Sequence, residues 1–250
     1  MEMARAIRGA LRPARFKVRN ARDQLLARRV RRRRKAFYSQ FLGTHSLAFD
    51  VGANEGNRVA AFIALGARVI AVEPLAECAD ALVSRFGDAC IVVREGLAAH
   101  EGTATLRTTS ASTIASMSDD FIRETRASGR FSQYEWADAR EVPVTTLDAL
   151  IVRFGTPDFI KVDVEGYEVE ILRGLSTGVP ALSFEYTAEL RQHARDCVSR
   201  IEQIGSYEFA YSAQETMIMT MPWTTGDAVL AGLQASGDPL EWGDIYARRL

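Results

Sequence analysis

Short apolar segments alternate with helical segments along most of the chain after residue 46. The predicted strands span residues 47–51, 69–72, 91–93, 142–145, 159–164 and 181–184. Helices are expected between them, at residues 58–65, 77–86, 147–153, 167–173 and 188–204. Neighbouring parallel strands need a long crossover connection, which is usually a helix. The alternation therefore predicts an α/β fold, with a mostly parallel sheet that has helices on both faces.

The rest of the chain adds smaller elements to this sheet. A short extra strand is expected at residues 103–108, and the polar stretch 110–140 contains a short predicted helix at 118–127. Residues 207–211 and 216–220 are expected to form a closing antiparallel pair. A length of 250 residues, 47% of them hydrophobic and 25% charged, suits one α/β domain with appendages.

The charges divide the chain into a basic arm and an acidic body. Residues 1–35 contain 14 Arg and Lys against 2 Asp and Glu, and the remaining residues contain 17 against 30. We therefore assign residues 1–40 to a basic, partly helical extension and residues 41–250 to the globular domain. The basic run at 31–35 predicts attraction to an acidic membrane surface, an anionic glycan or nucleic acid. The alternatives are pairing of the arm with the acidic body, or a frayed tail.

The sequence also bears on where such a protein works. No run of 18 apolar residues occurs, and the basic N-terminus lacks an uninterrupted apolar segment, so neither a transmembrane helix nor a secretory signal is expected. Cys78, Cys90 and Cys197 lie far apart without metal-binding spacing, which is typical of reduced core thiols. We expect a cytoplasmic protein that its basic arm could hold at the periphery of the membrane.

Two glycines mark the turn that follows the first predicted strand, in the segment Asp50-Val-Gly-Ala-Asn-Glu-Gly56. Ligands of α/β sheets bind at this kind of strand-to-helix junction. Gly52 and Gly56 permit positive φ angles and a close approach of the backbone to a ligand. Their spacing is not Gly-x-Gly-x-x-Gly, so the fingerprint of a dinucleotide site is absent. The turn favours a cofactor that has adenosine but no phosphates.

A carboxylate at the end of the second predicted strand supports the same interpretation. Glu73 follows the glycine turn by about twenty residues, the spacing at which an acidic side chain binds ribose hydroxyls. The next strand ends near Gly96 and Leu97, which would flank the adenine, with Leu97 as an apolar contact. The alternative for Glu73 is a solvated carboxylate in a loop.

Charged and aliphatic residues alternate in the predicted strand at 159–164 and just beyond it. Lys161, Asp163 and Glu165 are two residues apart, so in an extended strand their side chains point to one face. Strands inside a parallel sheet are usually covered on both faces, and burying three charges is costly unless they are paired or meet a ligand. Lys161 is also the only lysine after residue 35. These residues are therefore candidates for a functional site.

These motifs together resemble FkbM-type methyltransferases over about residues 45–220. The matching segments are Asp50-Val-Gly-Ala-Asn-Glu-Gly56, Val72-Glu73-Pro74, Thr146-Leu147-Asp148, Asp158-Phe-Ile-Lys-Val-Asp-Val-Glu-Gly-Tyr-Glu168, Leu172-Arg-Gly174 and Phe184-Glu185. The resemblance implies a class I, Rossmann-like methyltransferase fold with a seven-stranded sheet whose last strand is antiparallel. It also implies that S-adenosylmethionine is the cofactor. Asp163 would then lie near the transferred methyl, and the cofactor would be held by Asp50, Gly52, Asn54, Glu73 and the 95–97 turn.

The carboxylates near Asp163 are the candidates for catalysis. A sugar hydroxyl attacks poorly until it begins to lose its proton, so a carboxylate within hydrogen-bond reach would help. Asp163 is the first candidate for this base and Glu165 the second, and Lys161 would keep Asp163 ionised or orient the acceptor. Alternatively, the three residues form a structural ion network. We expect no resident metal, although Asp163, Glu165 and Glu185 are ligands that suit a hard divalent cation.

The predicted function is S-adenosylmethionine-dependent O-methylation of a hydroxyl on a carbohydrate or a natural product. One rival is a nucleic-acid methyltransferase, suggested by the basic arm. The chain lacks an Asn/Asp-Pro-Pro-Tyr motif, and its acidic body would repel phosphates, so nucleic acid is not expected as a partner. A second rival is a protein that binds the cofactor on a methyltransferase-like fold without catalysing transfer.

Overall fold

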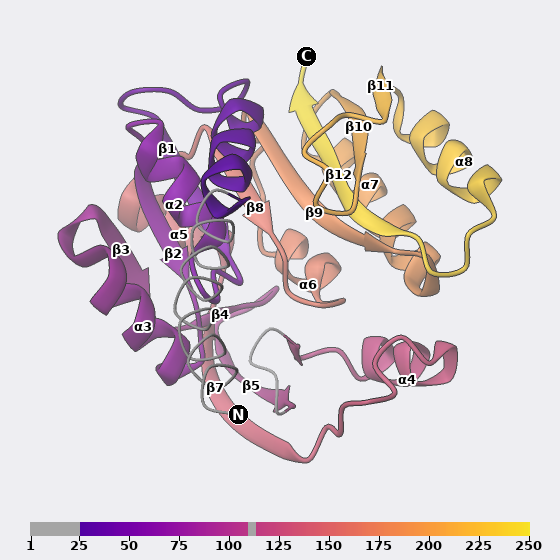
Figure 1. The fold of residues 1–250 in the computed structure, drawn as a ribbon, viewed down its shortest axis with the longest axis horizontal. Helices are drawn as coiled ribbons and strands as arrows, with labels where there is room; N and C mark the ends of the chain where they lie inside the picture. The colour runs from indigo at the N-terminus through magenta and orange to yellow at the C-terminus, as the bar shows by residue number, and fades with distance from the viewer. Residues whose placement is uncertain (1–25, 110–113) are drawn as a thin grey trace, which may run out of the picture.

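An eight-stranded sheet organises the protein in the computed structural model, which describes residues 26–109 and 114–250 (Figure 1). Its strands, in order across the sheet, are β11 (Met221–Thr224), β10 (Tyr207–Ala213), β12 (Trp242–Arg249), β9 (Ala181–Thr187), β8 (Phe159–Val162), β1 (Leu47–Val51), β2 (Arg68–Val72) and β3 (Cys90–Val93). The five strands from β9 to β3 are parallel, whereas β12 is antiparallel to both of its neighbours. The predicted α/β fold with a mostly parallel sheet is confirmed.

The C-terminal side of the sheet differs from the sequence prediction. Residues 216–220 are a loop rather than a strand, and Met217 within it has a φ of 52°. The partners of β10 are instead β12 and the short edge strand β11, which makes eight strands rather than seven. β12 lies in a stretch without a predicted strand, because the pairings that create it join segments that are distant in the sequence.

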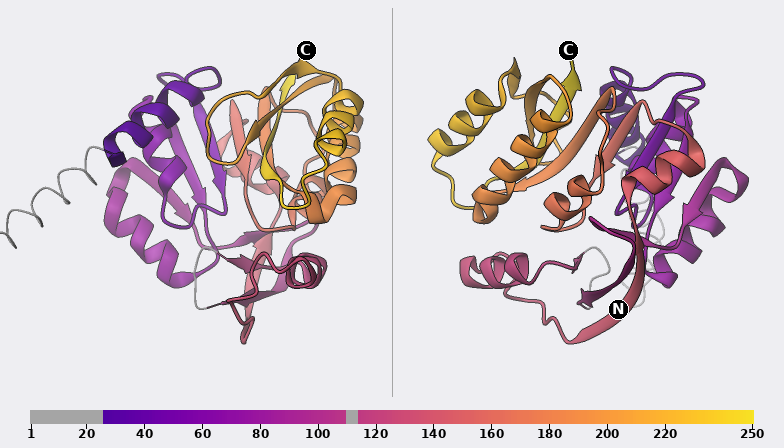
Figure 2. Two further views of the ribbon diagram at one scale, coloured as in Figure 1. Left: turned by 45° about the vertical axis from the view of Figure 1, so that its right-hand side comes forward. Right: turned by 180° about the vertical axis from the view of Figure 1, so that it is seen from behind.

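Helices cover both faces of the sheet (Figure 2). One face carries the N-terminal helix (26–38), α2 (Asn57–Ala64) and α3 (Ala76–Phe86), and the other carries α5 (Leu147–Phe154), α6 (Glu168–Arg173), α7 (Arg191–Gln203) and α8 (Gly226–Ser236). Short 3₁₀ turns precede β3 (η1, Gly87–Ala89) and α7 (η2, Ala188–Leu190). Alternate residues of β1 pack on opposite faces: Phe49 joins the core beneath α5 to α8, and Ala48 joins the core beneath α2. As a result, every residue of β1 is buried.

A second, four-stranded sheet lies beside the carboxyl ends of the parallel strands (Figure 1). Its order is β4 (Gly96–Leu97), β7 (Asp138–Thr145), β5 (Gly102–Thr108) and β6 (Ala115–Ser116), and α4 (Asp119–Ser128) follows β6. The hydroxyl of Ser116 donates to the carbonyl of Glu165 at 2.6 Å, and Arg130 forms two hydrogen bonds with the buried carboxylate of Glu189 at 2.7 and 2.9 Å. The first contact ties this segment to the turn that follows β8, and the second ties it to η2 after β9.

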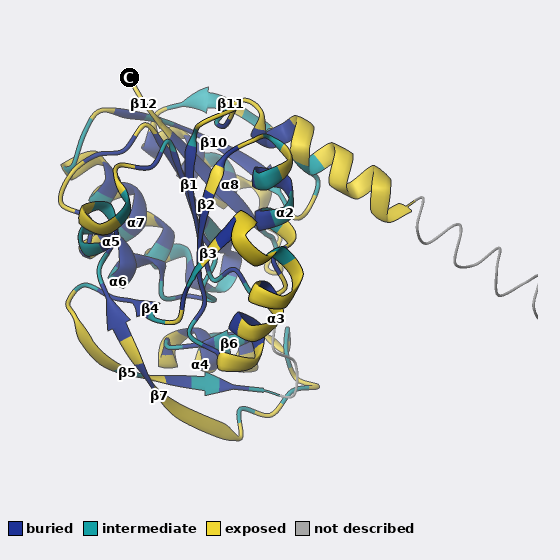
Figure 3. Ribbon diagram, turned by 90° about the vertical axis from the view of Figure 1, so that its left-hand side faces the viewer, coloured by how far each residue is buried: buried dark blue, intermediate teal, exposed yellow. Residues whose placement is uncertain are grey.

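The N-terminal helix changes character along its length (Figure 3). Residues 26–36 are exposed apart from the half-buried Arg34, whereas Phe37 and Tyr38 are buried. The ring of Phe37 lies 5.2 Å from that of Tyr246 in β12, and the ring of Tyr38 lies 4.9 Å from that of Phe62 in α2. The helix is thus anchored at its C-terminal end, and residues 1–25 of the predicted arm lie outside the described part. No described helix has both the length and the apolar character needed to span a bilayer.

Gly52 is expected to be irreplaceable for steric reasons. It has a φ of 78°, and a Cβ atom there would overlap the backbone carbonyl of Asp163. Gly52→Ala should therefore cost the strain of a positive φ, about 1–2 kcal/mol, and several more from the collision between the two loops. Urea unfolding measures the difference.

Gly237→Ala is the matched control. Gly237 has a φ of 68° but open space around its Cβ position. This variant should therefore lose only the unfolding free energy that the strain of a positive φ costs. Equal losses of unfolding free energy in the two variants would contradict the steric argument.

Candidate active site

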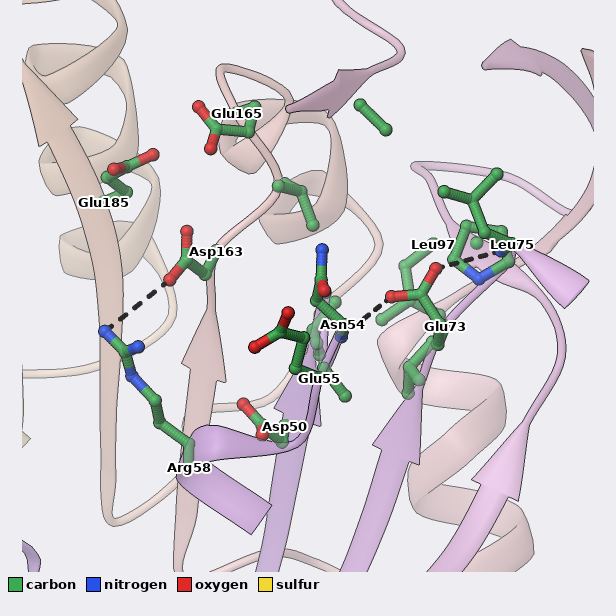
Figure 4. A pocket seen from close by; sticks show the side chains of 18 of the residues that line it. Asp50, Asn54, Glu55, Arg58, Glu73, Leu75, Leu97, Asp163, Glu165 and Glu185 are labelled. Carbon is green, nitrogen blue, oxygen red and sulfur yellow. Dashed lines mark hydrogen bonds and ion pairs between the residues drawn. The ribbon is translucent and has the colours of Figure 1, made fainter. Parts of the chain in front are cut away.

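A cavity of about 340 Å³ lies at the carboxyl ends of β1, β2 and β8, which is a common size and place for a ligand site in an α/β protein (Figure 4). Its walls come from the β1–α2 loop, the end of β2, β4, the turn after β8, and Glu185 of β9. Leu106, Met117, Glu215 and Trp242 complete the lining on the side of the second sheet and of the C-terminal loops.

The glycine turn forms one wall of this cavity. The N–H groups of Gly52 and Ala53 donate to the carbonyl of Val72 at 3.0 and 3.2 Å, which ties the turn to β2. Gly52 and Asn54 line the cavity, whereas Gly56 does not, and a Cβ at Gly56 would overlap the ring of Phe86. Gly52 thus fits closely against the Asp163 loop while it lines the cavity, and Gly56 fits against Phe86 outside it.

Glu73 is held in place by two backbone groups. Its Oε2 accepts from the N–H of Asn54 and its Oε1 accepts from the N–H of Leu75, both at 2.9 Å (Figure 4). The residue is only 4% exposed, and this burial raises the pKa of the carboxyl, while the two backbone hydrogen bonds oppose the rise. Each carboxylate oxygen keeps a lone pair, so a ligand with two adjacent hydroxyls fits this end of the cavity.

An apolar slot lies next to Glu73. Leu75 and Leu97 are almost completely buried, and both line the cavity. Gly96 also lines it, and a Cβ there would lie 3.3 Å from the Cε of Met117 and 3.2 Å from the Cγ1 of Val144. The absence of a side chain at Gly96 thus leaves room for a flat, apolar group between these residues.

Asp163 is held by two cations beneath and beside it. The Nζ of Lys161 lies 3.2 Å from its Oδ2, and the Nη2 of Arg58 lies 3.9 Å from the same atom. Burial raises the pKa of Asp163, but Lys161 and Arg58 outweigh burial and lower it. Lys161 is fully buried and does not line the cavity, and its second partner is Asp244 of β12 at 2.8 Å. Asp163 is therefore ionised at neutral pH.

The pKa values of the nearby carboxyls of Glu165 and Glu185 shift in the opposite direction. Burial raises the pKa of Glu165 and of Glu185 well above the ordinary value, the charge of Asp163 raises both further, and Glu165 adds to the rise at Glu185. One carboxylate oxygen each of Asp163, Glu165 and Glu185 lies within 4.8 Å of the other two. That spacing is compatible with the divalent cation considered from the sequence, and equally with carboxylates that share protons. The Oε2 of Glu185 is buried and has no hydrogen-bond partner among the described residues.

The strand at 159–164 is shorter than predicted, and this changes the geometry. β8 ends at Val162, and Glu165 has a φ of 56°, so Asp163 and Glu165 belong to a turn rather than to one face of a strand. Glu168 shapes this turn, because its Oε1 accepts from the N–H groups of Val164 and Gly166 at 3.2 and 3.1 Å. The turn, rather than strand alternation, brings Glu165 to Asp163.

Arg58, Asp244 and Glu215 were not identified from the sequence. Arg58 is the second residue of α2, where the helix dipole disfavours a cation, and this unfavourable position was a signal that it has an acidic partner. It pairs with Glu215 as well as with Asp163. Asp244 stands between the apolar residues of β12, a pattern that indicates a buried, paired charge. Glu215, in a loop, carried no comparable signal.

The cavity as a whole is acidic. Among its described lining residues Arg58 is the single cation, against seven carboxylates: Asp50, Glu55, Glu73, Asp163, Glu165, Glu185 and Glu215. Asp50 is 3% exposed, and burial raises its pKa to about 6. Such a lining favours a ligand with positive charge or with many hydrogen-bond donors and disfavours phosphates.

The strand order, with β12 reversed between β9 and β10, and a cavity at the carboxyl edge of the sheet define a class I methyltransferase fold. The family model described as the Methyltransferase FkbM domain matches residues 50–208. The chain belongs to this family, and S-adenosylmethionine is its expected cofactor. The cavity fits that molecule, because it offers a carboxylate for ribose hydroxyls, an apolar slot for adenine and negative charge for the sulfonium and ammonium groups.

Curated proteins and solved structures give no further information about the activity of the chain. No curated protein matches the chain. Similar solved structures include precorrin-6y C5,15-methyltransferase from Geobacter metallireducens (11% identity, TM-score 0.44, covering 86% of this chain and 88% of that one). An rRNA methylase from Streptococcus thermophilus (12%, 0.42, 86% and 93%) and a SAM-dependent O-methyltransferase from Thermotoga maritima (10%, 0.41, 86% and 64%) are similar to a comparable degree. At these low scores the likenesses carry no inference about activity.

Glu168 is expected to make the unfolding free energy fall as the pH rises from about 4.5 to about 7. The residue is 3% exposed, and burial raises the pKa of its carboxyl from 4.5 to about 7. The folded protein then binds the proton more tightly than the unfolded chain, so this stabilisation is complete below pH 4.5 and is lost by about pH 7, a total of roughly 3 kcal/mol. Glu168→Gln keeps an acceptor oxygen and should remove this component, which urea unfolding at several pH values measures.

Glu170→Gln is the control on the same helix, because the Glu170 side chain is 36% exposed and pairs with Arg173 at the surface. It should keep the wild-type pH dependence. A Glu168→Gln protein that loses as much stability between the two pH values as the wild type would contradict the assignment.

Proposed function

We propose that this protein transfers a methyl group from S-adenosylmethionine to a hydroxyl of a carbohydrate or a natural product. The observation that carries the proposal is the excess of hydrogen-bond acceptors around Asp163, where Glu165 and Glu185 add two more carboxylates within 4.8 Å. A molecule rich in hydroxyl groups supplies the donors that these oxygens lack, including the unpartnered Oε2 of Glu185. A phosphorylated acceptor would meet strong repulsion, which disfavours the nucleic-acid alternative.

The proposed cofactor site uses the glycine-turn side of the cavity. Glu73 would accept the two ribose hydroxyls, Leu75 and Leu97 would contact the adenine, and Asp50 and Asn54 would line the path of the amino-acid part. When bound, the cofactor supplies an already activated methyl group on a sulfonium. The remaining task for the protein is to align an acceptor oxygen and to exclude water.

The proposed proton acceptor is Asp163. Its charge is maintained by Lys161 and Arg58, so it can accept a hydrogen bond from the acceptor hydroxyl at neutral pH. As the hydroxyl oxygen forms its bond to the methyl carbon and the carbon–sulfur bond breaks, the hydroxyl proton passes to the Asp163 carboxylate. Burial raises the pKa values of Glu165 and Glu185, which leaves Asp163 as the carboxylate of the three that is available to receive the proton.

Cofactor affinity should depend on Glu73. Glu73→Gln should weaken binding of S-adenosylmethionine by roughly 10- to 100-fold, because two charge-assisted hydrogen bonds to ribose are lost. Isothermal titration calorimetry measures the affinity, and Glu77→Gln is the control, since Glu77 is exposed on α3 and pairs with Arg140. Absence of binding by the wild-type protein at micromolar concentrations would overturn the enzyme proposal itself.

Methyl transfer should depend on Asp163. Asp163→Asn should lower the transfer rate by roughly 10²- to 10⁴-fold, as expected for loss of a general base. The fold should persist, because Lys161 keeps Asp244 at 2.8 Å. The assay is release of S-adenosylhomocysteine with a panel of neutral glycosides and polyketide alcohols, and phosphorylated sugars serve as anionic counterparts.

Glu165→Gln should reduce the rate less than Asp163→Asn, and Glu77→Gln, at an exposed position outside the cavity lining, should have little effect. A fully active Asp163→Asn enzyme would remove Asp163 as the base. Bound cofactor with no transfer to any acceptor of the panel would favour the non-catalytic alternative.

A further inference from the structure

The outer part of the N-terminal helix carries unpaired positive charge. Six cations in this stretch are exposed, and none of them forms an ion pair with a described residue: Arg28, Arg29, Arg31, Arg32, Arg33 and Lys35. Arg34, in contrast, is half-buried against the body and bonded to Glu215. The remaining body carries a net negative charge, yet the helix does not fold back onto it (Figure 3). The pairing of the arm with the acidic body that the sequence allowed therefore does not occur for these six residues.

Two exposed aliphatic side chains lie among these cations. Leu26 is 61% exposed and Val30 is 40% exposed, and their i, i+4 spacing places them on the same side of the helix. Further along the same side come Arg33 and Arg34, and then Phe37, which is buried in the core. Two exposed aliphatic side chains thus lie on one side of an otherwise basic helix, a combination typical of helices that lie on lipid surfaces.

The same helix adjoins the mouth of the cavity. The Nη2 of Arg34 lies 3.2 Å from the Oε2 of Glu215, which is one of the cavity-lining residues. Glu215 is also paired with Arg58, and Arg58 lies 3.9 Å from Asp163. The inner end of the helix is thus in contact with the lining of the candidate active site.

We propose that the N-terminal helix docks the protein on an anionic lipid surface. Residues 26–36 extend about 15 Å along the helix axis, which exceeds the Debye length of about 10 Å at 0.1 M salt. The outer cations are therefore largely screened from the acidic body and are available to a charged surface. A nucleic acid would provide no partner for Leu26 and Val30, and lipid acyl chains do. The docking itself is independent of the proposed function. Its consequence rests on that function: a hydroxyl carried by a lipid would meet the cavity at the membrane.

Vesicle flotation with the full chain tests this proposal. The wild-type protein should bind vesicles that contain about 30% phosphatidylglycerol and should not bind pure phosphatidylcholine vesicles. Replacing Arg31, Arg32 and Arg33 by Gln should weaken binding on the order of 100-fold, because each cation near the surface contributes about 1 kcal/mol. The matched control replaces Arg94, Arg123 and Arg140 by Gln, which removes the same charge from exposed positions on the body and should change binding less than about threefold.

A second variant tests the apolar contribution. Leu26→Gln combined with Val30→Gln keeps every cation and should still weaken binding by about tenfold, because less apolar surface enters the interface. Circular dichroism checks that each variant keeps the wild-type fold.

Three results would overturn the proposal. The first is equal binding of the arm and body variants to anionic vesicles, and the second is failure of the wild-type protein to float with them. The third is tighter binding to a double-stranded or single-stranded oligonucleotide than to vesicles at the same salt concentration.

Discussion

The buried ammonium group of Lys161 is the interaction on which the rest of the site depends. It has no exposure to solvent and lies 2.8 Å from Asp244 and 3.2 Å from Asp163. Removing a charge from water is costly unless it is paired and hydrogen-bonded, so the fold must keep both carboxylates next to it. Asp244 belongs to β12 and Lys161 to β8, 83 residues earlier. Burial of Lys161 thus requires both that β12 inserts into the sheet with Asp244 and that Asp163 lies at the end of β8.

This constraint also separates the carboxylates of the cavity into two kinds. Asp163 faces Lys161 and Arg58, so its pKa is lowered despite burial. Glu165 and Glu185 have no such partner, and burial together with repulsion from Asp163 raises the pKa of each. Asp163 is therefore the carboxylate of the three that is ionised, and it is the one suited to accept a hydrogen bond from a hydroxyl. Family membership establishes methyl transfer, and the acid-rich lining supports the proposal that the acceptor is a hydroxyl.

Most strands of the sheet and several residues of the cavity lining could be predicted from local sequence patterns. The glycine turn, Glu73 and the Lys161–Glu165 segment all lie at ends of parallel strands, and such ends meet along one edge of a sheet whatever the details of packing. Less could be predicted where contacts are long-range. The pairing of β12 with β9 and β10, and the loop that carries Glu215, depend on contacts that no local periodicity indicates. Gly56 belongs to the predicted motif but does not line the cavity, and a Cβ atom there would overlap the ring of Phe86.

The sequence by itself determined the fold class, the edge of the sheet where the cavity lies and the basic character of the N-terminal arm, because periodicity, turn residues and charge are local properties. Only the tertiary structure decided what each charge does. It buried Lys161 away from the cavity, placed Arg58 beside Asp163, and formed a turn at Glu165 that brings three carboxylates together. The physical reason is that electrostatic interactions depend on the distances and burial of groups that are far apart in the chain, and the order of residues alone does not specify these.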